Sequence, residues 1–262
     1  MPKNYLITGL PRSGTTLLTS LLSENLEAVT FSEPEWLKKV RMKSDDCQEF
    51  TQEFSKKLVG LRNDIRNGHP VHIKTSRFNQ GLPQNYYHRN EKGEVVVDKE
   101  ESPILFPKEY ADRPFIIKAN AQFTACLGEL VKAEDYEIIC IVRDPVATIM
   151  SWRSLDLPIS HGNMKVAEKY HTNFNIETKS DDLLAKQILI LDWFFKQFIS
   201  YRNGINLVKY ESMVEQTNKI ISNILDKPIN NIIQLQSKNK NKYYKLKEES
   251  LIKAMLHSSG KY

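Results

Sequence analysis

The chain has few cysteines, and none of them forms a closely spaced pair. Its 262 residues include three, Cys47, Cys126 and Cys140. An odd number with no CxxC spacing predicts neither a disulfide framework nor a zinc site. Cys140 stands inside the apolar run Ile138–Val142, so we expect a buried structural thiol there rather than a nucleophile.

Long apolar segments are also lacking. No run approaches the roughly 20 apolar residues that a membrane-spanning helix needs. The first residues, Met1–Asn4, contain no apolar stretch followed by a small-residue cleavage site. We therefore expect a cytoplasmic protein with no membrane partner.

No large charge excess is present. The chain has 37 Lys and Arg against 32 Asp and Glu, a net charge of +5. This mild excess suits an anionic ligand but does not indicate a nucleic acid partner. The one dense basic cluster, residues 238–245, is expected to be an exposed polar turn, with a phosphate contact as the alternative.

Apolar runs alternate with helical patterns along the chain. Residues 5–8, 114–118, 137–142 and 205–210 are predicted to be buried strands, with residues 69–74 as a further candidate. Helical spacing of apolar residues occupies residues 15–22 and 181–201. This alternation predicts an α/β fold: one domain over residues 1–262, with a central parallel β-sheet flanked by helices on both faces.

Two segments interrupt the alternation, residues 78–110 and 154–180. Both are polar, aromatic and irregular, and the first has a hairpin signal around Asn90–Gly93. Long loops in a compact domain often bind ligands. We expect these two insertions to build the pocket for a substrate.

The first motif joins a predicted strand to a predicted helix through a glycine turn. Gly9 and Gly14 have the spacing of the P-loop pattern GxxxxGK[ST]. Backbone N–H groups of such a turn, and of the helix start, bind phosphate oxygens. The motif predicts a P-loop-type domain whose phosphate ligands are Arg12, Ser13, Gly14, Thr15 and Thr16.

This turn lacks the lysine of nucleotide kinases. Thr15 stands at that position, and a cation appears earlier, as Arg12. The lysine supports chemistry at the β- and γ-phosphates, so its absence favours a 5′-phosphosulfate over a triphosphate. The alternative is a structural corner with an incidental arginine.

The second motif ends a buried strand. Arg143 closes the run Glu137–Val142, Asp144 is a good helix N-cap, and Pro145 suits the first helical position. Ser151 follows about two turns into that helix. Arg143 and Ser151 are predicted to reach one anion at the carboxyl end of the sheet. A capped helix with a surface arginine is the alternative.

Together the two motifs resemble the sulfotransferases that depend on 3′-phosphoadenosine 5′-phosphosulfate (PAPS). The resemblance runs from Tyr5 to roughly residue 225, and the Pro-Arg-Ser-Gly-Thr-Thr turn is closer to the bacterial and protein-tyrosine branches than to the animal cytosolic enzymes. It implies that Arg12–Thr16 hold the 5′-phosphosulfate and that Arg143 and Ser151 hold the 3′-phosphate. Tyr210 resembles a tyrosine that contacts the nucleotide in this family, and a core tyrosine is the alternative.

The resemblance also implies the catalytic residues. Lys118 precedes Arg143 by the distance of the family's catalytic lysine. Asn120 stands where the cytosolic branch has a histidine base, so the base must come from elsewhere. Glu33 lies at the matching distance after Arg12 for the glutamate base of the protein-tyrosine branch, and Glu35 is its rival.

Two further expectations accompany this assignment, one about the backbone of Glu33 and one about a second lysine. Pro34 is expected to force Glu33 into an extended conformation in a loop at the edge of the sheet. Lys74 is a weaker rival to Lys118, because it lies too far before Arg143 in the sequence.

The resemblance implies that Glu33, Lys118 and Arg12 transfer a sulfuryl group from PAPS to a hydroxyl or amine, releasing adenosine 3′,5′-bisphosphate without a metal. A P-loop small-molecule kinase using MgATP and a catalytically inactive nucleotide-binding protein are the alternatives. The acceptor is expected to be a small, polar, cationic molecule, with a natural product as one candidate. The oligomeric state is left open. The expectation about the acceptor is based on residues in the variable loops: Trp36, Tyr86, Tyr87, His88, Trp152, Asp156 and His161.

Overall fold

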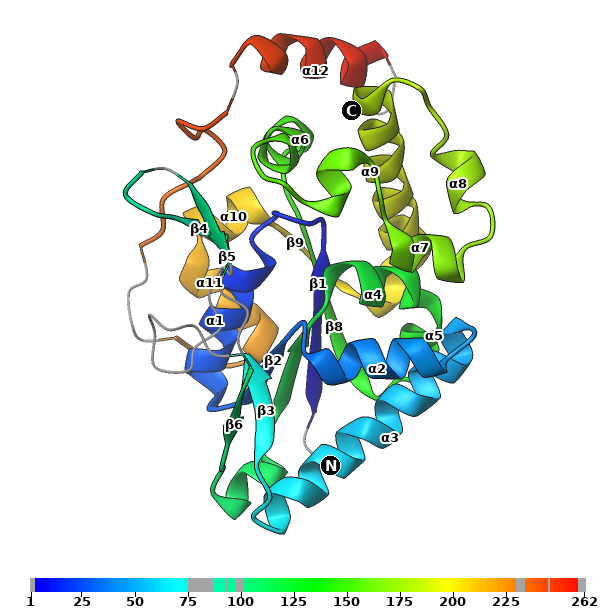
Figure 1. Ribbon diagram of the computed structural model, residues 1–262. Coiled ribbons are helices and arrows are strands. Elements are labelled where there is room, and N and C mark those ends of the chain that lie inside the picture. The colour runs from blue at the N-terminus through cyan, green and yellow to red at the C-terminus, as the bar shows by residue number, and fades with distance from the viewer. Residues whose placement is uncertain are drawn as a thin grey trace. The chain divides into compact units, whose positions relative to one another are not determined.

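The computed structural model describes residues 3–74, 87–92, 94–97, 101–229, 234–244 and 246–258 (Figure 1). By its contacts the chain divides into two compact units. Unit 1 consists of residues 1–7, 15–119 and 126–139, and unit 2 of residues 8–14, 120–125 and 140–262.

A parallel five-stranded sheet flanked by helices gives the α/β architecture that the alternation predicts. Its strand order is β2-β7-β1-β8-β9. Strands β1 and β8 each contribute residues to both units. The strands are β1 (Asn4–Gly9), β2 (Val29–Ser32), β7 (Phe115–Lys118), β8 (Tyr136–Val142) and β9 (Asn206–Lys209).

Strand β2 was not among the strands predicted from the sequence. Its residues read Val-Thr-Phe-Ser, so two polar residues break the apolar run, yet all four are buried. β2 pairs in parallel with β7, with Ser32 opposite Lys118. This register brings Glu33, the next residue, to the carboxyl end of β7.

In unit 1 the helices pack around an aromatic core. Trp36 makes an edge contact with Phe31 at 5.5 Å between ring centroids and stacks on Phe54 at 6.1 Å. The helical elements of this unit are α1 (Thr15–Leu26), α2 (Glu35–Lys43), α3 (Cys47–Arg66), η1 (Lys108–Asp112) and α5 (Leu127–Lys132).

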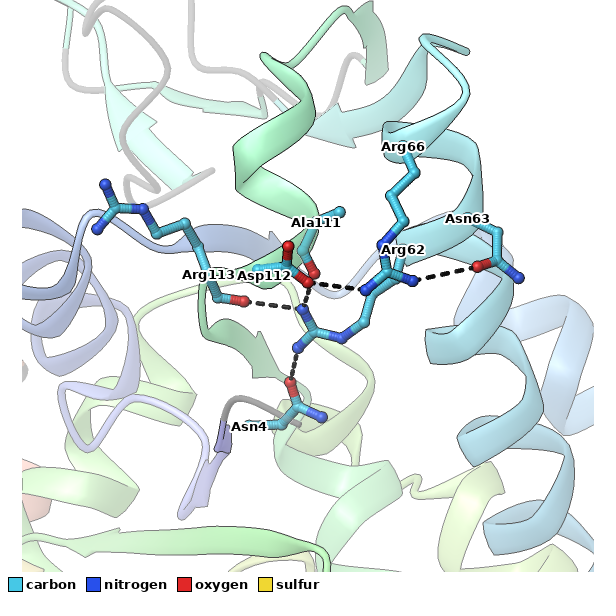
Figure 2. Close-up of polar contacts among 7 residues, drawn as sticks. All are labelled: Asn4, Arg62, Asn63, Arg66, Ala111, Asp112 and Arg113. Atoms are coloured by element: carbon cyan, nitrogen blue, oxygen red, sulfur yellow. Dashed lines mark hydrogen bonds and ion pairs between the residues drawn. The ribbon is translucent and has the colours of Figure 1, made fainter.

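A buried arginine ties α3 to the start of β7 (Figure 2). Arg62 is 3% exposed and donates to the carbonyl oxygens of Ala111 and Arg113 and to Asn4 Oδ1. Its guanidinium also lies 4.0 Å from the centre of the Phe115 ring. Burial lowers the pKa of this guanidinium. Arg62 therefore fixes three chain segments through neutral oxygens.

Two small antiparallel sheets complete unit 1. β3 (Val71–Lys74) pairs with β6 (Glu101–Ile104), so the candidate strand at residues 69–74 exists but lies outside the central sheet. β4 (Tyr87–Arg89) pairs with β5 (Val95–Val97), which confirms the predicted hairpin.

In unit 2, the long helix α9 carries much of the core. Trp193 packs edge-on against His171 and Phe174. Helix α12 buries Ile252 and Leu256 and contacts α6 and α9. The helical elements are α4 (Asn120–Ala125), α6 (Pro145–Arg153), η2 (Pro158–His161), α7 (Lys165–Tyr170), α8 (Phe174–Glu177), α9 (Leu183–Ser200), η3 (Arg202–Gly204), α10 (Tyr210–Glu215), α11 (Thr217–Leu225) and α12 (Leu246–Ser258).

Within the described ranges, no helix is both long enough and apolar enough to cross a membrane. Cys140 is fully buried, as predicted, and burial raises the pKa of its thiol.

Candidate functional site

The turn between β1 and α1 depends on its two glycines. Gly9 has φ +146° and Gly14 has φ +96°. A Cβ on Gly9 would lie 2.2 Å from the carbonyl oxygen of Ile141, and one on Gly14 would lie 2.8 Å from Tyr210 Cδ2. Only glycine therefore fits where the chain passes this closely to neighbouring residues.

Hydrogen bonds within unit 2 hold this turn in place. The Ser13 amide donates to Leu10 O, and the Ser13 hydroxyl donates to Ile141 O at 3.0 Å. The buried indole of Trp152 donates to Pro11 O at 2.7 Å. Trp152, which the sequence placed among the acceptor residues, instead supports the turn.

Arg12 connects the two sequence motifs. Its Nε donates to Ser151 Oγ at 3.4 Å, and its carbonyl oxygen accepts from Arg143 Nη1 at 2.8 Å. The second motif forms as predicted: Asp144 caps α6 by accepting from the Ala147 amide at 2.7 Å. Arg12 thus meets Arg143 and Ser151, which are distant from it in the sequence, within one unit.

Arg143 is 6% exposed, and the partners that the structure gives it are all neutral. Besides Arg12 O, they are Asn239 Oδ1 at 2.8 Å, Lys238 O, and Tyr244 Oη at 3.4 Å. The guanidinium lies 4.7 Å from the centre of the Tyr210 ring. We call Arg12, Arg143, Ser151 and Tyr210 the arginine cluster. The guanidinium of Arg143 faces neutral oxygens, which an anion can replace as partners.

A C-terminal segment, residues 237–244, covers the arginine cluster. The Lys238 amide donates to Tyr210 Oη at 2.9 Å, and Asn239 Nδ2 donates to Glu211 Oε1 at 2.7 Å. The sequence predicted an exposed turn here. The side chain of Lys238 is exposed, but its backbone and Asn239 bind the cluster. The sequence prediction for this segment was based on its lysine charges, and it did not identify Asn239 as a partner of Arg143.

Tyr210 differs slightly from its predicted place at the end of a strand. β9 ends at Lys209, and Tyr210 begins α10. Its ring is buried between Gly14 and Arg143.

Thr15 and Thr16, the remaining residues of the first motif, begin α1 in unit 1. Thr15 is buried and Thr16 is partly exposed. Their role as phosphate ligands stays a prediction.

A second group in unit 1 contains the predicted base. Lys118 Nζ lies 2.6 Å from Glu33 Oε1, and the Glu33 amide donates to Lys118 O at 2.8 Å. Lys118 is 5% exposed, whereas the Glu33 side chain is 45% exposed. The two residues that the family resemblance implied are catalytic are therefore in direct contact.

Glu33 is not extended, contrary to the expectation from Pro34. Its φ is +46°, in the left-handed region. The expectation considered only the steric effect of the following proline. In the fold, bonds to the Glu33 amide, carbonyl and carboxylate together override that local preference.

Lys74 is the third member of this group. It is 7% exposed, and its Nζ donates to the carbonyl oxygen of Glu33 and lies 3.9 Å from Glu35 Oε1. The sequence distance between Lys74 and Arg143 made Lys74 a weaker candidate than Lys118 for the catalytic lysine. That distance does not indicate whether Lys74 lies near Glu33 in space. We call Glu33, Lys74 and Lys118 the glutamate cluster.

Backbone strain marks one residue in each cluster. Five non-glycine residues in the described ranges have positive φ. Glu27, Glu134 and Asp226 follow helix ends, where this conformation is common. Arg12 and Glu33 do not, and such strain costs about 1–3 kcal/mol and often accompanies functional sites.

The predicted acceptor residues separate into different environments. Trp36 belongs to the aromatic core, and Asp156 pairs with His161 at 2.6 Å on the surface. Tyr86 lies outside the described residues, as do the side chains of Tyr87 and His88.

Unit 2 has a hollow of about 250 Å³ whose lining includes His171, Glu177 and Gln197. It involves the predicted insertion at residues 154–180. An acceptor pocket built from both insertions stays a prediction.

Comparison with family models matches residues 5–227 to the sulfotransferase family. Among solved structures, the chain is similar to the sulfotransferase STF9 from Mycobacterium avium, with 13% identity and a TM-score of 0.40. That match covers 98% of this chain and 76% of the mycobacterial one. No curated protein matches the chain.

Proposed function

We propose that this chain, which belongs to the sulfotransferase family, transfers a sulfuryl group from PAPS to a hydroxyl or amine of a small polar acceptor. Family membership supports sulfuryl transfer in general. The donor, the acceptor class and the residue roles are our proposal.

The observation that carries the choice of donor is the arginine cluster. Arg12 and Arg143 come from two separate motifs, and Ser151 adds a hydroxyl beside Arg12. The guanidinium of Arg143 has donors that can bind two oxygens of a phosphate at once. The oxygens that Lys238 and Asn239 present to Arg143 are neutral, so an anion can replace them without breaking an ion pair of Arg143. These residues would suit a ligand with two separate anionic groups, a phosphate at one position and a phosphosulfate at another.

PAPS, when bound, supplies the sulfuryl group and leaves as adenosine 3′,5′-bisphosphate. Arg143 and Ser151 would hold the 3′-phosphate, beside the Tyr210 ring. Arg12 and the start of α1, with Thr15 and Thr16, would hold the 5′-phosphosulfate.

Glu33 would accept the proton of the attacking hydroxyl or amine. The acceptor forms a bond to sulfur as the bond from sulfur to the 5′-phosphate oxygen breaks. Lys118 would stabilise the charge that develops on the transferred and bridging oxygens. Its contact with Glu33 supports a shared role in one reaction.

A binding assay separates this proposal from a kinase. Adenosine 3′,5′-bisphosphate is expected to raise the melting temperature, whereas MgATP is expected to have little effect. Adenosine 5′-monophosphate, which lacks the 3′-phosphate, is the matched control ligand. Equal stabilisation by the bisphosphate and the monophosphate would contradict the assignment of Arg143.

A transfer assay then separates an enzyme from an inactive binding protein. The protein is incubated with ³⁵S-labelled PAPS and a panel of phenols, alcohols and polar amines. Transfer of label to one acceptor class is expected. Binding of the bisphosphate with no transfer to any class would support an inactive protein.

A further inference from the structure

Lys74 is a buried cation to which the proposed reaction gives no role. It ends β3, a strand of the small antiparallel sheet, opposite Glu101 of β6. A buried ammonium group is unfavourable unless it is hydrogen-bonded or paired. Glu35 Oε1 lies 3.9 Å from Lys74 Nζ, and the Glu35 side chain is largely exposed. Lys74 Nζ also donates to the backbone carbonyl of Glu33.

That contact acts on a strained residue. Glu33 has φ +46° although it has a side chain and precedes a proline. The left-handed conformation persists only where the surroundings hold it. Lys118 binds the amide and the carboxylate of Glu33, and Lys74 binds the carbonyl. The direction of the Glu33 side chain therefore depends on both lysines.

In the proposed reaction, Lys118 cannot keep its whole interaction with the carboxylate of Glu33, because the same ammonium group has a second role. Its Nζ pairs with Glu33 Oε1 at 2.6 Å, and the reaction also requires it to stabilise the transferred group. Lys74 binds the backbone rather than the carboxylate, so its hold does not compete with the proton that Glu33 must accept.

We infer that Lys74 is a positioning residue, which keeps the carboxylate of Glu33 aimed at the acceptor while Lys118 turns to the donor. This inference rests on the proposed function for the role of Glu33. It concerns the backbone of Glu33 and places no contact between Lys74 and the substrate.

A double-mutant cycle tests whether Lys74 acts through Glu33. Lys74→Met is expected to lower kcat by about 10- to 100-fold, since small displacements of a catalytic group have effects of this size. The KM for PAPS is expected to stay within about twofold, because the nucleotide ligands are elsewhere. In a Glu33→Gln background, Lys74→Met is expected to change kcat by less than about twofold. An equal loss in both backgrounds would overturn the inference.

Two further variants guard against a general loss of structure. Lys56→Met removes an exposed lysine of α3, paired with Glu53, and is expected to leave kcat unchanged. If Lys74→Met does not fold, Lys74→Gln keeps an N–H donor without the charge and enters the same cycle.

A crystal structure of the Lys74→Met protein gives a readout that does not need activity. Glu33 is expected to leave its positive φ, and the Lys118–Glu33 contact is expected to break. Retention of φ near +46° with that contact intact would overturn the inference. If the wild type transfers no sulfuryl group, the proposed function fails, and if Glu33→Gln keeps full activity, the assignment of Glu33 as the base fails. In either case this crystal structure still decides whether Lys74 holds Glu33.

Discussion

The glutamate cluster of unit 1 and the arginine cluster of unit 2 bury their cations with different partners. In the glutamate cluster, Lys118 faces a carboxylate at 2.6 Å. In the arginine cluster, Arg143 faces backbone, amide and hydroxyl oxygens. A carboxylate such as that of Glu33 can accept a proton from a substrate, and a lysine beside it can stabilise developing negative charge. Arginine stays charged and presents a planar array of donors, which suits a fixed anion.

Arg62 shows that neutral partners alone do not identify an anion site. It is as buried as Arg143, lies over an aromatic ring, and also binds neutral oxygens. Arg143 differs in its location, because it follows β8 at the cap of α6 and binds the carbonyl of Arg12 in the glycine turn. This location at the carboxyl end of a sheet strand is why we propose a binding role for Arg143 and a structural one for Arg62.

The largest expected effect is on the glutamate cluster. Glu33→Gln removes the proposed base while keeping the size of the side chain, so kcat is expected to fall about 10²- to 10⁴-fold. The affinity for adenosine 3′,5′-bisphosphate is expected to stay unchanged, since that ligand has no sulfuryl group. Steady-state kinetics and calorimetric titration give the two values. Glu35→Gln is the matched control, and a larger loss there would make Glu35 the base.

Next in size is the loss of the structural arginine. Arg62→Met removes the arginine donor from two carbonyl oxygens and one of the two donors to Asn4 Oδ1, so we expect a loss of about 3 kcal/mol in the free energy of unfolding. Arg66→Met, four residues along α3, breaks an exposed ion pair with Asp112 and is expected to cost less than about 1 kcal/mol. Urea unfolding measures the free energy of unfolding of both variants. Equal effects would contradict the structural role of Arg62.

Arg143→Met tests the proposed binding role of Arg143 and compares it with the structural role of Arg62. We expect the Kd for adenosine 3′,5′-bisphosphate to rise about 10- to 100-fold, as for the loss of a charged hydrogen-bonding group. Its effect on stability is expected to be smaller than that of Arg62→Met. Arg202→Met, at an exposed position of unit 2, is the control. Calorimetric titration gives the Kd, and an unchanged value would remove Arg143 from the nucleotide site.

The smallest effect is expected from the glycine turn. Gly14→Ala would bring a Cβ within 2.8 Å of Tyr210, at a backbone conformation that alanine rarely adopts. We expect about a tenfold rise in the Kd for the bisphosphate, corresponding to about 1.4 kcal/mol of strain. Gly60→Ala, in the interior of α3 with no neighbour within 4 Å, is expected to stabilise the protein by about 0.5–1 kcal/mol. An unchanged Kd for the bisphosphate in Gly14→Ala would show that the turn tolerates a side chain.

The sequence alone determined the parts of the molecule that follow local rules. The alternating apolar runs gave the α/β fold, Asp144-Pro145 gave the cap of α6, and the glycine spacing gave the turn after β1. Each depends on residues close together in the chain, whose backbone preferences and periodicity can be read directly.

Only the tertiary structure decided which distant groups meet. It made Val29–Ser32 a sheet strand despite its polar residues, because pairing with β7 and burial outweigh a weak local pattern. It set Glu33 at positive φ against the preference before proline, and it joined Lys74 to Glu33 and Asn239 to Arg143. Such contacts depend on strand order and on where a terminal segment packs, and neither is encoded in the spacing of residues along the chain.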